Sequence, residues 1–472
     1  MTRRALILAG GGIRVAWQTG ALAALDEDGL TFDHGDGTSG GIFTLAMLLS
    51  GQRPDEMIRR WTALDIRSFV SPLPLRSYLR SPTDWVAFGG SAGVRDAVLP
   101  ALGIDLDRVR AADTMTGSFN VADFARKRCV AIPHTEIDED RLVAGVSLAG
   151  VMPAVEHGGR TWTDAVWIQD ANLMEAVRRG CDELWVLWCI GNTPRWGAGA
   201  LEQYVHMIEM SATGALSGEL EAIADLNRRR AGGEPVLGST DQVTVHVIRP
   251  DLPIPLDPDL VVGRIDAETL IAMGYRDARH YLATRSPGGT PLTEDATRTP
   301  ARELGARITL RASGATDGGR LGYTLVLEAD DLAALSRTPD AEMGVVGTLR
   351  HPRLGLLLLG GGTARLTGHG ADRRLEVRAD VRLHDGVGEL AVDVPLPRGR
   401  PHAARHHGWR ITGPHDAPWS GRADMTAGQA VRALASFEPS GAHHLSDRAR
   451  ALGLAVRLAR RDGAGAPVRV PA

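Results

Sequence analysis

Two patterns of apolar and polar positions divide the sequence. In the first part, an apolar run at residues 5–9 is followed by glycines at 10–12 and by apolar side chains at helical spacing over 13–26. A similar order of apolar segment, glycine turn and helix recurs over residues 30–49, and a helix and an apolar strand follow over 172–190. Alternating strands and helices predict an α/β fold, in which helices cover both faces of a mainly parallel sheet.

The second pattern begins after a stretch in which periodicity is lost. Residues 286–303 are dominated by Pro, Gly, Thr and charged residues, which is typical of a linker. Beyond it, apolar and polar residues alternate with a period of two, most cleanly over 375–383. The sequence therefore predicts an α/β domain over residues 1–285 and a β-rich, sandwich-like domain over 304–472. The pattern over roughly 426–461 is compatible with terminal helices.

The composition makes several classes of enzyme improbable. The chain has 472 residues and a formal net charge of -4, so no global field favours nucleic acid or an anionic membrane. Lys127 is its only lysine, and its surroundings fit no Walker loop, Ser-Lys pair or Schiff-base motif. The three cysteines show no CxxC spacing, and neighbouring histidines such as His406-His407 and His443-His444 would point to opposite faces of a strand. We therefore expect no metal site and no cofactor.

The apolar segments bear on where the protein acts. The run at residues 5–9 is too short for the core of a signal peptide and ends in glycines rather than in a cleavage site. The apolar stretch over 354–359 is too short to span a bilayer. The sequence therefore predicts a soluble, cytoplasmic protein.

A G-x-S-x-G pentapeptide, Gly37-Thr38-Ser39-Gly40-Gly41, lies between a strand-like and an apolar helical segment. In such a turn, the glycines let the serine backbone adopt a strained conformation that lifts the hydroxyl out at the helix N-terminus. The helix dipole there favours developing negative charge. Ser39 is the candidate nucleophile, and the other four residues form its elbow, although the pentapeptide alone also fits an ordinary turn serine.

The second candidate element is the run Gly10-Gly11-Gly12-Ile13-Arg14, between the first predicted strand and helix. Glycines there leave backbone N–H groups free to point into a site, as the oxygen anion of an acyl-transfer intermediate requires. A dinucleotide-binding loop would need its third glycine at position 15, where Val15 stands. We therefore expect these five residues to form an oxyanion hole.

Together, the glycine run and the serine elbow resemble the patatin-like phospholipases. The similarity continues through Val146–Val155 and Thr163-Asp164-Ala165-Val166, and it covers roughly residues 4–285. It implies a three-layer α/β sandwich and a serine lipid acyl hydrolase with a Ser-Asp dyad. By the same resemblance, Asp164 is the base. Asp170 is the rival acid, but Asp164 better keeps the spacing to Pro153 and Gly180.

The implied dyad makes a physical demand on the carboxylate. An aspartate has a reference pKa of about 3.9 and is then a poor base. Burial beside Ser39 must raise the pKa of Asp164 if it is to accept the serine proton.

Departures from the family pattern keep an alternative open. Val15 replaces the glycine that usually follows Arg14, and Ala165 and Val166 replace the residues that usually follow the aspartate. The alternative is a catalytically degenerate patatin fold that binds lipid or acts as a scaffold. The expected partner is a lipid or acyl-ester substrate, with contact to a membrane or micelle surface as a possibility.

The sequence points to no nucleic acid and identifies no protein partner. Its β-rich region, including Gly322-Tyr323-Thr324-Leu325 and Asp330-Asp331-Leu332, faintly resembles an accessory module of cholesterol-oxidase-like proteins.

Overall fold

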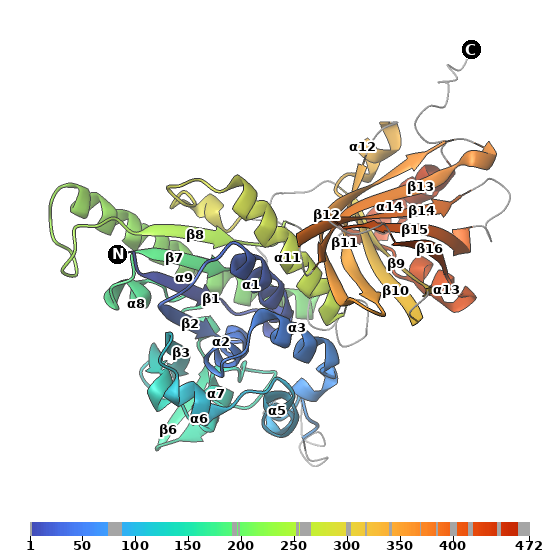
Figure 1. Ribbon diagram of the computed structural model, residues 1–472. Coiled ribbons are helices and arrows are strands. Elements are labelled where there is room, and N and C mark those ends of the chain that lie inside the picture. Colours follow the sequence, from blue (N-terminus) through green and yellow to red (C-terminus); the bar gives the residue numbers. More distant parts are fainter. Residues whose placement is uncertain are drawn as a thin grey trace. The chain divides into compact units, whose positions relative to one another are not determined.

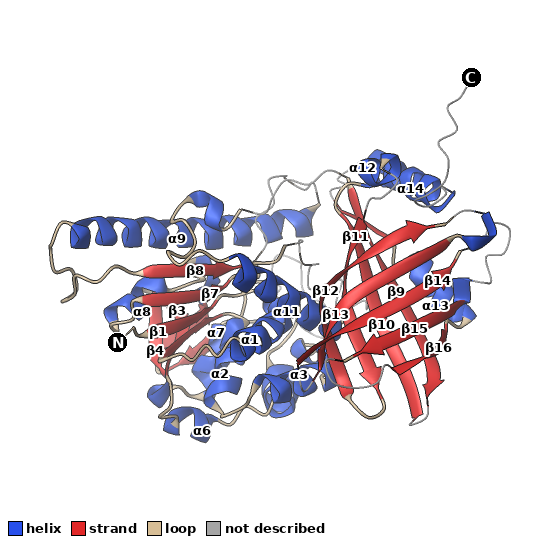
Figure 2. Cartoon of the chain, turned by 45° about the horizontal axis from the view of Figure 1, so that its top comes forward, coloured by secondary structure: helices blue, strands red, loops and turns tan. Residues whose placement is uncertain are grey.

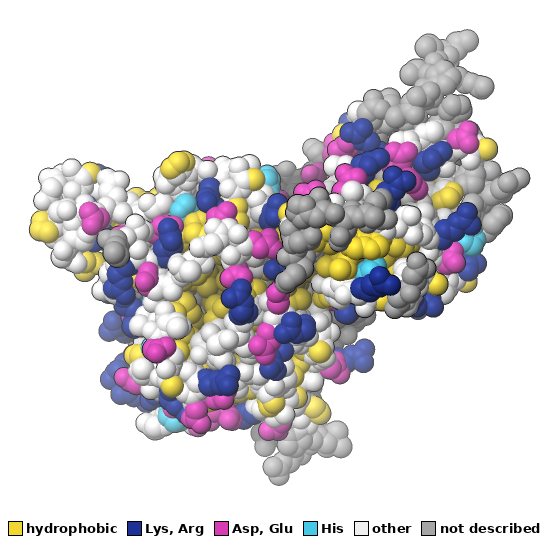
Figure 3. All heavy atoms as spheres, viewed as in Figure 1, with side chains coloured by type: hydrophobic (Ala, Val, Ile, Leu, Met, Phe, Trp, Pro, Cys, Tyr) yellow, Lys and Arg dark blue, Asp and Glu magenta, His cyan; other side chains and the backbone are white. Residues whose placement is uncertain are grey.

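The computed structural model divides into two compact units, Met1–Thr299 and Pro300–Ala472 (Figure 1). The residues that the structure describes are 2–73, 87–190, 196, 199–251, 254, 266–298, 304–316, 319–338, 342–368, 370–383, 386–396, 404–413, 419–440 and 445–460. Within these residues, no helix is both long enough and apolar enough to cross a membrane. On the face shown in Figure 3, basic and acidic side chains are interspersed over the first unit.

The first unit is built on an eight-stranded sheet in the order β5-β6-β3-β2-β1-β7-β8, with β4 paired to β3. The path from β3 through β2, β1 and β7 to β8 is parallel, whereas β4, β5 and β6 pair antiparallel. The predicted α/β fold with a mainly parallel sheet is thus confirmed. The strands are β1 (Arg4–Leu8), β2 (His34–Thr38), β3 (Thr116–Asp123), β4 (Arg128–Pro133), β5 (Val155–His157), β6 (Arg160–Asp164), β7 (Glu183–Leu187) and β8 (Thr244–Ile248).

Helices cover both faces of the central strands. Ala5 and Ile7 of β1 share a buried cluster with Leu216 of helix α9, while Leu6 and Leu8 on the opposite face are also fully buried. Helices α2 and α11 contact β1 and β8, respectively. The helices include α1 (Ala16–Glu27), α2 (Gly41–Leu49), α3 (Pro54–Ala63), α5 (Leu99–Ala101), α6 (Leu106–Ala111), α7 (Glu139–Gly145), α8 (Leu173–Arg178), α9 (Ala200–Ala231) and α11 (Ala267–Thr284).

The central strand β2 is unusually polar for its position. His34 and Asp36 are both fully buried within it. The Ser118 hydroxyl, on the neighbouring strand β3, lies 3.1 Å from His34 Nε2 and donates a hydrogen bond to Asp36 Oδ2 at 2.5 Å. Asn120 Nδ2 donates to Asp36 Oδ1, also at 2.5 Å. These cross-strand hydrogen bonds allow polar side chains in the middle of the sheet.

The stretch predicted as a linker contacts the first unit at several points, although most of its described residues, 286–298, are exposed. The Thr290 N–H donates to the Val245 carbonyl at 2.7 Å, and Ala296 is 5% exposed within the core around β7 and β8. The division between the units, at 299/300, falls inside the predicted linker 286–303, near its end. The functions assigned to the two domains remain predictions.

The second unit is a closed antiparallel sheet. Strands β9 to β16 each pair with the next, and β16 pairs again with β9, which also carries the short strand β17 (Figure 2). The strands are β9 (Gly305–Thr316), β10 (Gly319–Ala329), β11 (Glu342–His351), β12 (Gly355–Thr367), β13 (Arg374–Leu383), β14 (Gly386–Pro395), β15 (His406–Thr412), β16 (Trp419–Asp424) and β17 (Glu438–Ser440). Helices α12 (Leu332–Arg337), α13 (Ala427–Ala435) and α14 (Leu445–Arg460) complete the unit.

The predicted β-rich, antiparallel domain is confirmed, although its strands close into one barrel-like sheet rather than two facing sheets. The apolar positions that alternate along β13, from Leu375 to Leu383, all belong to one buried cluster. A strand with one buried face shows this alternation in either architecture, so the pattern could not separate them. Register shifts at Val345/Gly347 and Leu359/Gly361 mark irregular points in the ladder, which help a sheet to bend.

Candidate active site

The serine elbow has the strained geometry that its sequence predicts. Strand β2 ends at Thr38, helix α2 begins at Gly41, and Ser39 between them has a φ of 51°, which non-glycine residues rarely adopt. The glycines beside it are required by close packing. A Cβ added at Gly40 would lie 2.3 Å from the Gly12 carbonyl oxygen, and one at Gly41 would lie 2.1 Å from that of Leu8.

The sheet brings Ser39 and Asp164 together across 125 residues of sequence. Thr38 pairs with Asn120 on β3, and Val121 on β3 pairs with Asp164 at the end of β6. The Ser39 hydroxyl donates a hydrogen bond of 2.6 Å to Asp164 Oδ2. Both side chains are thus held by the ends of ordered strands rather than by free loops.

Asp164 is fully buried, and this burial raises its pKa to about 7. The hydrogen bonds from Ser39 and from the Val166 N–H, the latter 2.9 Å from Oδ1, oppose that rise. The carboxyl group therefore has a pKa near neutrality, which suits a group that must both accept and return a proton.

The residues after Asp164 keep its environment intact although they are not glycine. The contact at Oδ1 comes from the backbone of Val166, which any residue except proline could supply. The Ala165 and Val166 side chains are 0% and 2% exposed, so they pack into the protein and leave the carboxylate accessible to its donors.

The glycine run lies against the serine elbow. A Cβ at Gly10 would lie 2.8 Å from Ser39 Cβ, and Gly12 has a φ of 60°, in the left-handed region. Arg14 Nε donates to the Gly11 carbonyl at 3.1 Å and braces the turn. Ile13, which lies between Gly12 and Arg14, is 7% exposed in the short helical turn that Gly12 begins.

Asp170 is a second buried carboxyl group in the site. Its Oδ1 accepts the Gly10 N–H at 2.8 Å, and within the described residues its Oδ2 has no hydrogen-bond partner. Burial raises the pKa of Asp170 to about 8; the Gly10 N–H lowers it, the Asp164 charge raises it, and Arg14 lowers it. Asp170, the alternative candidate for the catalytic base, thus contacts the glycine run, whereas Asp164 contacts Ser39.

A layer of buried polar residues lies next to these groups and was not singled out by the sequence. Asn120 Nδ2 donates to Thr38 Oγ1 at 2.9 Å as well as to Asp36, and Asn172 Nδ2 donates to Asn120 Oδ1 at 3.0 Å. Burial raises the pKa of Asp36 to about 7. The sequence contains one local sign of this polar layer, which is the presence of His34 and Asp36 in a buried strand.

The histidines make pairwise contacts in the second unit. His406 Nδ1 lies 2.7 Å from Asp424, whereas His407 contacts Tyr323 and, at 2.9 Å, the Ala404 carbonyl. Among the described residues, no group of three or more His, Cys, Asp or Glu side chains could hold a metal ion. The pair His443-His444 lies outside the described residues.

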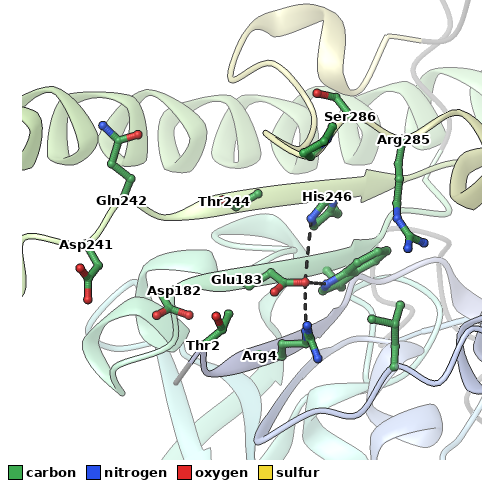
Figure 4. A pocket seen from close by; sticks show the side chains of 13 residues that line it. Thr2, Arg4, Asp182, Glu183, Asp241, Gln242, Thr244, His246, Arg285 and Ser286 are labelled. Carbon is green, nitrogen blue, oxygen red and sulfur yellow. Dashed lines mark hydrogen bonds and ion pairs between the residues drawn. The ribbon is translucent and has the colours of Figure 1, made fainter.

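A polar cavity of about 670 Å³ belongs to a different part of the first unit (Figure 4). It lies at the amino ends of β1, β7 and β8, where Glu183 contacts Arg4 at 3.0 Å and accepts the Trp185 Nε1–H at 2.7 Å. Ser39 follows the carboxyl end of strand β2, which is parallel to β1, so it lies at the opposite ends of these strands. This cavity is therefore not part of the Ser39 site.

No curated protein matches this chain. Among solved structures, it is similar to VipD from Legionella pneumophila, at 12% identity over 60% of this chain and 67% of that one, with a TM-score of 0.32. The patatin-like phospholipase family matches residues 6–177, a range that contains the glycine run, Ser39, Asp164 and Asp170. The N-terminal region of this chain therefore carries a patatin-like phospholipase domain.

Proposed function

We propose that this protein is a serine lipid acyl hydrolase in which Ser39 and Asp164 form the catalytic dyad. The observation that carries the proposal is the 2.6 Å hydrogen bond from the Ser39 hydroxyl to a fully buried carboxylate whose pKa is near neutrality. The match of residues 6–177 to the patatin-like phospholipase family supports an acyl ester of a lipid as the class of substrate.

In the proposed first step, Ser39 Oγ attacks the ester carbonyl carbon while its proton passes to Asp164 Oδ2. Negative charge develops on the carbonyl oxygen, and amides within the glycine run stabilise it. The Gly10 and Arg14 N–H groups donate to Asp170 Oδ1 and to the Gly11 carbonyl, so the amides of Gly11, Gly12 and Ile13 are the proposed donors. The leaving alcohol then takes the proton from Asp164, which leaves an acyl group on Ser39. Asp164 then takes a proton from water as the water oxygen attacks the acyl carbon, and it returns that proton to Ser39 Oγ when the bond from Ser39 to the acyl group breaks and the fatty acid leaves.

A lipid substrate also implies contact with a membrane or micelle surface, and this contact belongs to the proposal. So does a cytoplasmic site of action. The alternative, a lipid-binding or scaffolding protein with an inactive patatin fold, differs in one chemical respect, which is the reactivity of Ser39.

The test is turnover of p-nitrophenyl butyrate, combined with labelling by a fluorophosphonate probe and mass analysis of the labelled peptide. The Ser39→Ala variant should lose turnover by about 10³-fold or more and should not be labelled. Ser217→Ala, a partly buried serine on α9, is the matched control and should behave as the wild type. Turnover that survives in Ser39→Ala would refute the assignment, and a wild-type chain that neither turns over nor reacts would favour the scaffold.

A further inference from the structure

Asp170 is a buried carboxyl group to which the proposed mechanism gives no role. It lies between strand β6 and helix α8, in a segment that is held in place next to it. The Ala171 side chain is fully buried in the core of the first unit, and Asn172 Nδ2 donates to Asn120 Oδ1 at 3.0 Å. Asp170 itself is 0% exposed. A polar group buried this deeply requires a hydrogen-bond partner or another reason to be there.

The partner of Asp170 is the first residue of the glycine run. The Gly10 N–H donates to Asp170 Oδ1 at 2.8 Å, and the Gly10 carbonyl accepts a hydrogen bond from the Cys189 thiol at 3.0 Å. A Cβ added at Gly10 would lie 2.3 Å from Asp170 Oδ1 and 2.8 Å from Ser39 Cβ. The carboxyl group and the serine side chain thus lie on the same side of Gly10, and Asp170 fixes the start of the glycine run beside the candidate nucleophile.

The other carboxyl oxygen of Asp170 indicates which charge state this place accommodates. Asp170 Oδ2 is buried and has no hydrogen-bond partner among the residues that the structure describes. An ionised carboxylate is stabilised by donors at both oxygens, whereas a neutral carboxyl group carries its own proton on one of them. Burial raises the pKa of Asp170 to about 8; the Gly10 N–H lowers it, the charge of Asp164 raises it and that of Arg14 lowers it. The geometry and the burial thus both favour the protonated form at neutral pH.

We propose that Asp170 is a positioning residue of the hydrolase, which holds the glycine run against Ser39 through the Gly10 N–H while its own carboxyl group is neutral. This inference rests on the proposed function, because the position of the run matters only if an oxyanion forms beside it. A neutral carboxyl group keeps the hydrogen bond and adds no second negative charge where the ester oxygen must become negative. An ionised carboxyl group in the same place would repel that oxygen.

The charged and titratable groups around Asp170 come from three other segments. Asp164 stands at the end of β6, Arg14 lies in the turn after the glycines, and the Cys189 thiol, after β7, is bonded to the Gly10 carbonyl. Asp164 must be ionised to act as the base, so activity requires one carboxyl group of the site to be charged and the other to be neutral. The rate should therefore decrease on both sides of a narrow pH range.

The test is the pH profile of kcat/KM for p-nitrophenyl butyrate from pH 6 to pH 9.5, with Ser39→Ala as the blank at each pH. The wild-type value should fall above about pH 8, by about tenfold for each further pH unit, as Asp170 ionises. Asp170→Asn keeps an oxygen for the Gly10 N–H and cannot ionise. This variant should stay within about threefold of the wild type at pH 7.5 and hold that rate up to pH 9.5.

Asp277→Asn is the matched control. Asp277 is only 2% exposed and burial raises its pKa to about 6, but it is bonded to Trp17 and paired with Arg276 rather than with the glycine run. This variant should keep the alkaline decrease. Asp170→Ala removes the acceptor for Gly10 and should lower kcat at least tenfold with little change in KM. The profile of the isosteric Asp170→Asn decides the matter if Asp170→Ala does not fold.

The outcomes separate this inference from the proposed function. An alkaline decrease that persists in Asp170→Asn, or a wild-type profile that stays level up to pH 9.5, would overturn the inference and leave the hydrolase intact. A loss of turnover in Asp170→Asn as large as that in Asp164→Asn would also overturn it, because the carboxyl group would then act as an acid or a base. A wild-type chain without turnover at any pH would overturn both.

Discussion

The charge of Asp170 gives the sharpest prediction from the first unit. Burial raises its pKa from 3.8 to about 8, so the folded protein keeps a proton that the unfolded chain loses above pH 3.8. The contribution of this group to stability therefore falls as the pH rises, until the folded-state pKa is reached near 8. The shift of about four pKa units, at about 1.4 kcal/mol each, corresponds to a contribution of about 6 kcal/mol that this group loses between pH 3.8 and pH 8.

Asp170→Asn removes this dependence and keeps the hydrogen bond, because an amide oxygen can accept the Gly10 N–H as Oδ1 does. The free energy of unfolding of the variant, relative to the wild type, should increase by about 3 kcal/mol between pH 5 and pH 7. The assay is pulse proteolysis across a urea series, read as survival of peptides that contain β1, so that it reports on the first unit alone.

Asp107→Asn, at a side chain that is 92% exposed, is the control and should show no such trend. If the difference between Asp170→Asn and the wild type does not change between pH 5 and pH 7, Asp170 is not protonated in the folded protein. The proposed electrostatics of the site would then be wrong, since Asp164 is buried in the same surroundings and interacts with Asp170.

Three further outcomes are expected from the site. Asp164→Asn should lower kcat/KM for p-nitrophenyl butyrate by about 10²–10⁴-fold. The wild-type rate should decrease below about pH 7, because protonated Asp164 cannot accept the serine proton. A wild-type rate that stays level down to pH 5 would contradict this. Gly40→Ala should lower kcat by about 10²-fold or more, because its Cβ would lie 2.3 Å from the Gly12 carbonyl oxygen and displace the glycine run; normal kcat would show that the run tolerates displacement. Val166→Ala should change kcat/KM by less than about tenfold, because Asp164 is bonded to the backbone N–H of that residue; a larger loss without unfolding would assign the side chain a role.

The parallel sheet could be predicted from local signals, because apolar runs followed by glycines, as over residues 5–12, mark strands that end in turns. The proximity of Ser39 to Asp164 left no such signal, because the segment before Ser39 is polar and Asp164 is followed by Ala165 and Val166. The resemblance supplied the pairing between them, and the structure has the two side chains in hydrogen-bond contact. That they perform catalysis stays a prediction.

The rest could not be predicted because its partners are far apart in sequence and have no motif. Asp170 contacts Gly10 across 160 residues, and Asn120 contacts Asp36 across 84. Closure of the second sheet depends on the pairing of β16 with β9, and period-two alternation does not specify which strands pair.

The buried carboxyl groups favour an enzyme over a scaffold. Asp36, Asp164 and Asp170 are all fully buried in the first unit, and burial raises the pKa of each one. Each of them destabilises the fold at neutral pH relative to an apolar residue of similar shape, and Asp170 Oδ2 gains no hydrogen bond from the described residues in return. A fold used only to bind lipid has no need of such groups beside a strained serine. An acyl hydrolase does, because its carboxylate must have a pKa high enough to accept a proton from a hydroxyl.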